Sequence, residues 1–89
     1  MEPVVVPING VLDLHTFAPG DLEGLMQDYI EACLEANIYD LRIIHGKGSG
    51  VMRARVRSLL KTDMRVQTVE DAPPDAGGWG ATRVRLKRS

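Results

Sequence analysis

Two side chains capable of proton chemistry lie close together near the start of this 89-residue sequence. Asp13 and His15 are two residues apart in the stretch Leu12-Asp13-Leu14-His15, so on a strand they share one face, with Cα atoms about 6.6 Å apart. An imidazole can accept and donate protons near neutral pH, and a carboxylate can orient it or attract a cation. The same pair suits a structural role, in which Asp13 accepts backbone N–H groups of a neighbouring loop.

A second stretch is rich in glycine and is predicted to connect a strand to a helix. Its alternate glycines allow a tight turn and expose backbone N–H groups, the helix N-terminus adds partial positive charge, and Lys47 adds a full one. This combination suits a phosphate. The spacing matches neither a P-loop nor a Rossmann fingerprint, and a tight connection that needs positive φ explains the same residues without a ligand. The stretch is His45-Gly46-Lys47-Gly48-Ser49-Gly50.

A third stretch, Gly77-Gly78-Trp79-Gly80-Ala81-Thr82, contains the chain's single tryptophan in a predicted surface loop. An aromatic ring in such a loop can stack on a nucleobase, an interaction that contributes about 1–3 kcal/mol per base. The alternative is that Trp79 folds back as a lid over the small core. Both interpretations stay open at the level of the sequence.

Charge is distributed unevenly although the formal net charge is only −1. Residues 1–40 hold eight acidic side chains and no Lys or Arg, whereas residues 41–89 hold 11 basic and four acidic side chains, which gives 11 − 4 = +7. Such a molecule would orient an approaching polyanion, unless its acidic and basic faces cancel across the fold. Arg53, Arg57 and Lys61 are four residues apart and form a basic stripe on a predicted helix.

The composition excludes several other classes of protein. The length fits one domain, and no apolar run approaches the roughly 18 residues of a membrane span. Residues 1–12 lack Lys and Arg and include two prolines, which makes a poor signal peptide, so we expect a cytoplasmic protein without a membrane partner. Cys33 is the only cysteine; it predicts a buried side chain in a reducing compartment, and no Cys/His spacing typical of a metal site occurs.

Hydrophobic periodicity predicts an α/β fold with the order βαβαββ. Two helices would pack on one face of a four-stranded mixed sheet, with strands 11–15 and 41–45 parallel and 41–45 central. His15 and His45 would then both lie at carboxyl ends of strands, where open α/β sheets bind ligands. We expect Asp21 to cap the first helix and Asn37 to end it in the left-handed conformation. The remaining predicted elements are helices 21–36 and 50–61 and strands 65–70 and 82–87.

Residues 11–89 are predicted to form the domain, and residues 1–10 an N-terminal extension or edge segment. Residues 4–8 are apolar enough to add a short edge strand, with the prolines limiting further pairing.

Together the three stretches resemble the Smr (small MutS-related) domain over residues 11–86. The matching motifs are LDLH at residues 12–15, HGKG at 45–48 and GGWGAT at 77–82. The resemblance implies a fold similar to the C-terminal domain of bacterial translation initiation factor 3, binding to DNA or RNA, and endonuclease activity. It also implies that Asp13 and His15 serve cleavage, and that His45, Gly46, Lys47 and Gly48 serve nucleic-acid contact and catalysis.

One residue departs from the pattern of the larger family members, which have glycine directly after LDLH. Here that residue is Thr16, followed by Phe17, as in the short stand-alone bacterial members. Threonine partly blocks the close approach of a phosphate to the backbone that glycine permits. The departure bears on catalysis rather than on membership.

The sequence therefore predicts a small, monomeric nucleic-acid-binding domain with endonuclease activity. His15 would act as general acid and base, Asp13 would orient it, and His45 is a further catalytic candidate. No dedicated metal cage is visible, and Mg²⁺ or Mn²⁺ is a candidate cofactor only. The alternatives are a non-catalytic module that binds nucleic acid or a ribonucleoprotein, and a protein-interaction domain that uses the acidic first helix. The residues predicted to contact nucleic acid are Gly46, Lys47, Gly48, Ser49, Arg53, Arg57, Trp79, Arg83 and Arg85.

Overall fold

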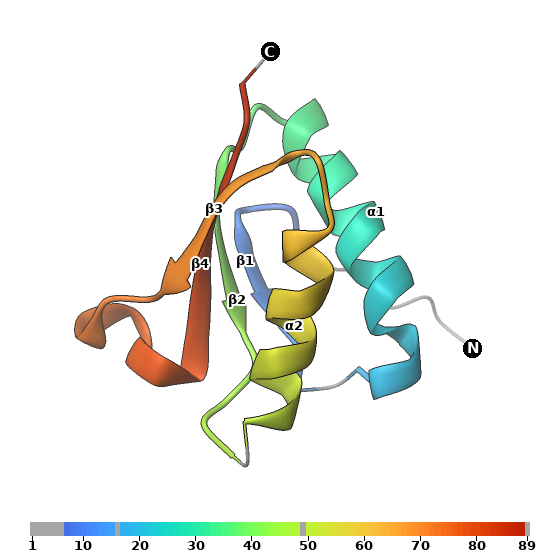
Figure 1. Ribbon diagram of the computed structural model, residues 1–89. Coiled ribbons are helices and arrows are strands. Elements are labelled where there is room, and N and C mark those ends of the chain that lie inside the picture. Colours follow the sequence, from blue (N-terminus) through green and yellow to red (C-terminus); the bar gives the residue numbers. More distant parts are fainter. Residues whose placement is uncertain (1–6, 16, 49, 89) are drawn as a thin grey trace.

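The computed structural model describes residues 7–15, 17–48 and 50–88 and has the predicted βαβαββ order (Figure 1). Its strands are β1 (Val11–Asp13), β2 (Asp40–Ile44), β3 (Val66–Asp71) and β4 (Ala81–Leu86). Its helices are α1 (Leu22–Glu35) and α2 (Val51–Lys61), with short 3₁₀ turns η1 (Pro19–Asp21), η2 (Pro74–Ala76) and η3 (Gly78–Gly80).

The four strands form one mixed sheet in the order β1-β2-β4-β3. β1 runs parallel to β2, and β4 runs antiparallel to both β2 and β3. β2 is therefore internal, as its apolar sequence predicts. The register pairs Asp13 with Ile44 and Ile44 with Ala81, so the ends of β1 and β2 meet the start of β4 at one end of the sheet.

Both helices cover the same face of this sheet (Figure 1), which confirms the predicted two-layer architecture. Alternation places Leu41 and Ile43 of β2, and Val84 and Leu86 of β4, toward the helices. Cys33 of α1 is fully buried in this layer, as predicted. The core is made of Leu12, Leu14, Leu22, Met26, Tyr29, Ile30, Cys33, Leu41, Ile43, Val56, Leu60, Val84 and Leu86.

The two ends of α1 differ in how well they follow the prediction. Asn37 adopts φ 59°, and the Ile38 N–H donates to the Cys33 carbonyl at 2.8 Å, which is the expected left-handed termination. The predicted side-chain cap by Asp21 is wrong, since its side chain makes no capping bond. Asp21 already has helical dihedral angles because η1 runs directly into the helix, whereas a capping residue needs extended ones.

Strand β1 ends two residues earlier than predicted, at Asp13. The Asp13 carboxylate accepts the backbone N–H of His15, and the Phe17 N–H donates to the Leu14 carbonyl, so the chain turns there. Residues 7–10 form no strand; Gly10 instead donates its N–H to the Tyr29 hydroxyl. The other residues of the predicted edge strand, 4–6, lie outside the described part. None of the helices described is long and apolar enough to span a bilayer.

Candidate functional site

Asp13 and His15 form the pair that their spacing predicts. The carboxylate oxygen Oδ1 of Asp13 lies 2.5 Å from His15 Nδ1 and also accepts the His15 backbone N–H at 2.9 Å. Those two hydrogen bonds, the backbone one first, hold the pKa of Asp13 below its ordinary value. Both side chains are exposed, 68% for His15 and 58% for Asp13. With Nδ1 directed at the carboxylate, Nε2 is the nitrogen left to reach a substrate.

His45 is held much more tightly than His15. Its Nδ1 lies 3.0 Å from the Gly46 carbonyl, and its Nε2 lies 2.8 Å from Oγ1 of Thr82, a fully buried residue of β4. A carbonyl can only accept, so Nδ1 carries the proton and donates, and Nε2 accepts from the threonine hydroxyl. Both ring nitrogens are therefore occupied within the protein. These contacts favour a role in fixing the loop that follows β2, and the catalytic assignment of His45 stays a prediction.

The loop after β2 packs against the turn that precedes β4. The Gly80 carbonyl accepts the backbone N–H groups of both His45 and Gly46, at 3.1 and 2.9 Å. A Cβ at Gly80 would lie 3.2 Å from Lys47 Cγ, so glycine lets the two loops approach closely, and a larger residue would have to displace the Lys47 side chain. The sequence motifs HGKG and GGWGAT are thus two sides of one structural unit, an association that their separation in the chain does not reveal.

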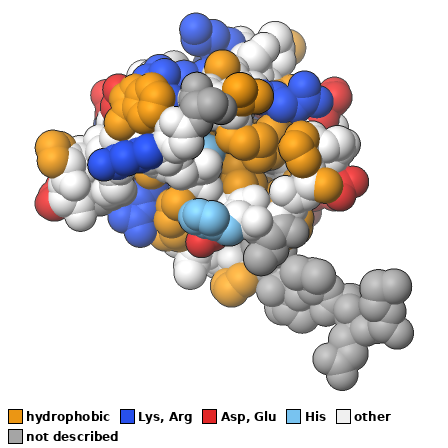
Figure 2. All heavy atoms as spheres, turned by 90° about the horizontal axis from the view of Figure 1, so that it is seen from below, with side chains coloured by type: hydrophobic (Ala, Val, Ile, Leu, Met, Phe, Trp, Pro, Cys, Tyr) orange, Lys and Arg blue, Asp and Glu red, His pale blue; other side chains and the backbone are white. Residues whose placement is uncertain are grey.

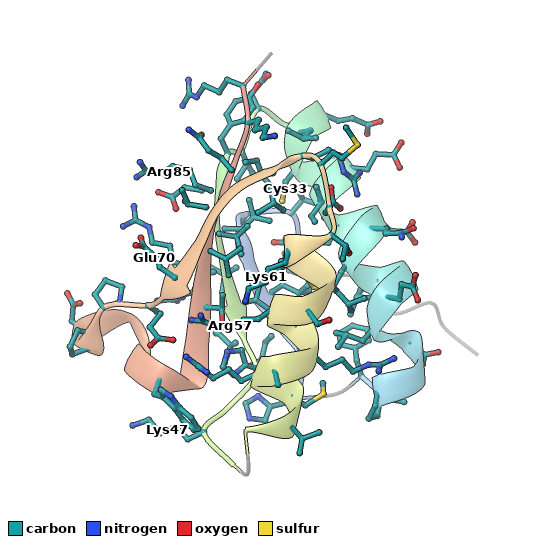
Figure 3. All side chains as sticks on the ribbon, in the orientation of Figure 1. Cys33, Lys47, Arg57, Lys61, Glu70 and Arg85 are labelled. Carbon is teal, nitrogen blue, oxygen red and sulfur yellow. The ribbon has the colours of Figure 1, made fainter. Side chains whose placement is uncertain are left out.

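A small hollow of about 180 Å³ opens between this loop and the first turn of α2. The N-terminus of α2 adjoins it, and Gly50 reaches the helix with a φ of 84°, as the glycine-rich sequence predicts. Lys47 extends outward at the lower end of the molecule (Figure 3), where it lines a separate hollow with Gly77 and Gly80. The hollow is lined by His45, Gly46, Gly48, Gly50, Val51, Met52 and Arg53. Ser49, also predicted to contact nucleic acid, lies outside the described residues.

Trp79 is neither a buried lid nor a fully free ring. It is 45% exposed, and its indole lies over Gly50, where a Cβ would be 3.4 Å from the ring. The guanidinium of Arg53 lies 5.0 Å from the ring centroid, a cation–π distance. Trp79 therefore joins the η3 turn to the start of α2 and keeps part of its ring accessible.

Arg53 and Arg57 point toward the end of β3 rather than into solvent. Both donate to Oδ1 of Asp71, at 2.7 and 2.5 Å, and the Arg53 hydrogen bond, first among the causes, lowers the pKa of Asp71. The predicted stripe is therefore partly neutralised by a carboxylate that lies 14 and 18 residues away in the sequence. Lys61, the third residue of the stripe, lies at the far end of α2 (Figure 3).

Arg85 lies on the opposite face of the sheet from Arg57 (Figure 3), and the alternation of β4 places Arg83 on the same face as Arg85. Arg83 donates two hydrogen bonds to the Asp40 carboxylate, at 3.1 and 2.9 Å, and Arg85 approaches the same carboxylate at 4.0 Å. The fold thus separates the predicted basic residues of α2 and β4 onto two faces. The clean alternation of β4 that the sequence predicts is confirmed.

The structure brings most of the predicted site residues to one end of the molecule. Asp13 is the last residue of β1, and His45 directly follows β2. The backbone hydrogen bond from the Leu14 N–H to the Ile44 carbonyl, at 3.0 Å, joins the two strand ends. Viewed from this end, histidine, basic and hydrophobic side chains share the surface (Figure 2). Sequence reasoning missed Thr82 as a partner of His45 and Asp71 as a partner of the arginines.

The described residues offer no group of three or more His, Cys, Asp or Glu side chains arranged to hold a metal ion. Asp13 and His15 supply two ligand side chains at most, and one atom of each is already hydrogen-bonded to the other. A structural cation cage of the kind built from several carboxylates is thus not formed by this part of the chain.

Comparison with known proteins gives a consistent result. A family model described as the Smr domain matches residues 12–87. The chain is 44% identical over 91 aligned positions to Endonuclease MutS2 of Latilactobacillus sakei subsp. sakei, covering 93% of this chain and 12% of that protein. It is 42% identical over 62 positions to Endonuclease MutS2 of Finegoldia magna, covering 70% of this chain and 8% of the relative. The chain therefore spans about a tenth of the length of these relatives.

Two solved structures are similar over most of the chain. The Smr domain of Thermus thermophilus MutS2 superposes with a TM-score of 0.83 at 32% identity, covering 90% of this chain and all of that domain. YdaL, a stand-alone small MutS-related protein from Escherichia coli, superposes with a TM-score of 0.82 at 27% identity, covering 89% of this chain and 65% of YdaL.

Proposed function

The chain belongs to the Smr domain family, and we propose that it binds nucleic acid and cleaves its phosphodiester backbone at the end of the molecule where β1 and β2 stop. The single observation that carries the cleavage step is the Asp13–His15 pair. The pair is exposed, is held in one geometry by two hydrogen bonds, and keeps one imidazole nitrogen for a substrate. Its relatives named as endonucleases support the same class of activity.

Binding would begin at the glycine-rich loop. Lys47 supplies a full positive charge at this loop, and the N-terminus of α2 supplies a partial one beside a hollow large enough for a phosphate group. Arg53 lines the same hollow and positions the Trp79 ring, whose accessible part can stack on a base. These contacts recognise backbone charge and an aromatic surface rather than base edges, so they support binding without strong sequence preference.

His15 would move protons at the scissile phosphate. As a general base, Nε2 would take the proton of the attacking hydroxyl or water as its oxygen bonds to phosphorus. The phosphorus–oxygen bond to the leaving strand then breaks, and the protonated imidazole returns a proton to that oxygen. Asp13 would hold the ring through Nδ1 and stabilise the imidazolium formed in between, because its lowered pKa keeps the carboxylate charged.

Mg²⁺ and Mn²⁺ remain candidate cofactors, and the cleavage assay is the test of their role. The donor set beside His15 does not complete a cation site, since the described residues supply no third ligand there. No step is therefore assigned to a cation. A cation carried by the phosphates of the substrate would act in addition to His15, and assays with and without divalent ions distinguish the two contributions.

A second function, binding without cleavage, is favoured by one observation. Asp13 accepts the backbone N–H of His15, so the carboxylate also fixes the turn after β1 and could be retained for that purpose alone. In that case Lys47, Arg53 and Trp79 keep their roles in binding, and His15 has no catalytic role. The predicted cytoplasmic location and monomeric state accompany either function as proposals.

The two functions are distinguished by incubating the chain with supercoiled plasmid and with structured RNA, with and without Mg²⁺ or Mn²⁺. We expect strand breaks, lost in His15→Ala with affinity within about twofold of the wild type. Lys47→Ala should weaken both binding and cleavage, whereas Lys61→Ala, an equal loss of charge at the far end of α2, is the matched control. Wild-type protein that binds but never cuts under any of these conditions would leave the non-catalytic module as the function.

A further inference from the structure

Two arginines share one oxygen of one carboxylate on the helix side of the sheet. Arg53 and Arg57 lie one turn apart on α2, and each donates from Nη2 to Oδ1 of Asp71, the last residue of β3. Among the described residues no donor reaches the second oxygen, Oδ2. Two guanidinium groups are thus paired with one carboxylate, through a single oxygen of that carboxylate.

This contact leaves donors of both arginines unused. The Nε atoms of Arg53 and Arg57 are buried and have no acceptor within the described part of the chain. The arginine side chains are only 22% and 21% exposed, whereas Asp71 is 48% exposed. An unsatisfied buried N–H costs free energy, so an anion that offered a separate oxygen to each guanidinium group would suit this pair better than Asp71, which uses one oxygen for both.

The position of the pair relative to the glycine-rich loop is the third observation. Arg53 lines the hollow between that loop and α2, and the same guanidinium lies 5.0 Å from the centroid of Trp79. A phosphate in the hollow would therefore lie beside the residue that Asp71 holds. Asp71 and a phosphate in the hollow would therefore compete for the guanidinium group of Arg53.

We propose that Asp71 is an internal competitor for nucleic-acid phosphate, which holds Arg53 and Arg57 in place in the free protein and gives them up to the bound strand. The inference rests on the proposed nucleic-acid binding and adds a carboxylate that limits its strength. A phosphodiester carries one negative charge shared over two oxygens, as a carboxylate does, so it can take the place of Asp71 without changing the charge around the two guanidinium groups. The exchange keeps the arginines neutralised at all times, so they stay ordered near the core without a ligand.

The exchange changes how binding depends on salt. Each phosphate that a basic residue neutralises releases condensed counterions, which contributes about −0.9 to the slope of log K against log salt on duplex DNA. When the phosphate displaces Asp71, the freed carboxylate attracts cations from solution and offsets part of that release. Removing the charge of Asp71 should therefore make the slope steeper by about one unit and should tighten binding most at low salt.

The test compares Asp71→Asn with Asp63→Asn. Both variants remove one negative charge from a carboxylate that pairs with arginine, but Asp63 pairs with Arg65 at the other end of β3. Affinity for a fluorescent DNA duplex is measured from 50 to 200 mM salt. We expect the gain in affinity of Asp71→Asn over Asp63→Asn to be about three- to fourfold larger at 50 mM than at 200 mM salt, from a slope difference near −0.9. Equal slopes in the two variants, or weaker binding by Asp71→Asn, would overturn the proposal.

A measurement on the wild-type protein keeps the proposal testable if Asp71→Asn does not fold. The ¹³C resonance of the Asp71 carboxyl group is followed while the DNA duplex, and separately pyrophosphate, is added to saturation. We expect this resonance to shift with both ligands and that of Asp63 to stay in place. A static Asp71 signal at saturating DNA contradicts the exchange. Absence of DNA binding altogether contradicts the proposed function instead, and the pyrophosphate titration then decides on the exchange by itself.

Discussion

Replacing each histidine by alanine should separate the chemistry of this site from its scaffold. The His15 ring is 68% exposed, and among the described residues it hydrogen-bonds only Asp13, which is exposed too. Exposed pairs of this kind contribute about 0–1 kcal/mol to stability. For a domain of this length 1 kcal/mol corresponds to roughly 4–8 °C in Tm, so His15→Ala should lower Tm by a few degrees at most.

His45→Ala should behave in the opposite way. It removes the acceptor for the hydroxyl of Thr82, a residue with no exposed surface, and leaves that hydroxyl buried without a partner. A buried group left unsatisfied costs about 1–3 kcal/mol. We therefore expect Tm to fall by roughly 4–24 °C. Thr82→Val is the matched control, because it removes the same hydrogen bond from the other side and should cost a similar amount.

The assay combines thermal unfolding followed by circular dichroism with strand cleavage below the lowest Tm of the set. At that temperature His45→Ala should still cut nucleic acid, whereas His15→Ala should lose the roughly 100- to 10,000-fold that general acid–base catalysis contributes. The reasoning is refuted if His45→Ala unfolds like the wild type but no longer cuts. It is also refuted if His15→Ala is destabilised by more than about 2 kcal/mol, since an exposed pair cannot account for that loss.

Three further predictions concern acid stability, Trp79 and the charged turn after β1. The Arg65 guanidinium donates two hydrogen bonds to Asp63, and these bonds, with one from the Arg65 backbone N–H, lower the pKa of Asp63. The stability that Asp63 contributes is therefore present above about pH 4 and is lost as the pH falls through the lower folded-state pKa. Urea unfolding from pH 7 to 2 should show this fall in stability, and the fall should be smaller in Asp63→Asn. Trp79→Ala should lower the free energy of unfolding by about 2–3 kcal/mol, because roughly half of an aromatic surface of ~200 Å² is buried and burial contributes about 25 cal/mol per Å². The variant should also bind oligonucleotide more weakly. Unchanged affinity would show that the ring does not contact the nucleic acid. Asp13→Asn should keep the turn but slow cleavage, and a normal rate in a variant that unfolds earlier would assign Asp13 to the turn alone.

The fold could be predicted because each element carries its own local pattern. The alternation of β4 and the three- and four-residue spacing of α1 specify which face each element buries, and the apolar β2 segment indicates a central strand. The element ends were less accurate, and the end of β1 shows why. That strand ends where the Asp13 side chain accepts the backbone N–H of His15. Such a side-chain hydrogen bond competes with strand pairing, and the spacing of apolar residues does not predict it.

The site could be predicted only where its residues are neighbours in sequence or in parallel strands. Asp13 and His15 are two residues apart, and the strand ends follow from the crossover rule. The partners of His45 and of the α2 arginines come instead from β4 and β3, 37 and at least 14 residues away. Those contacts depend on the antiparallel pairing of the last two strands and on where α2 crosses them, which no local pattern encodes.

Those long-range contacts change what can be inferred from the positive charge of residues 41–89. A balance of +7 over residues 41–89 suggests a broad cationic surface, yet Arg53, Arg57, Arg65 and Arg83 each pair with a carboxylate within 3 Å. Two of those carboxylates, Asp63 and Asp71, come from the same half of the chain, whereas Asp40 comes from the acidic half. Lys47, by contrast, makes no ion pair within the described part of the chain and lies at the end of the sheet shared by Asp13 and His45. The convergence of strand ends, more than the total charge, therefore indicates where a phosphate would bind.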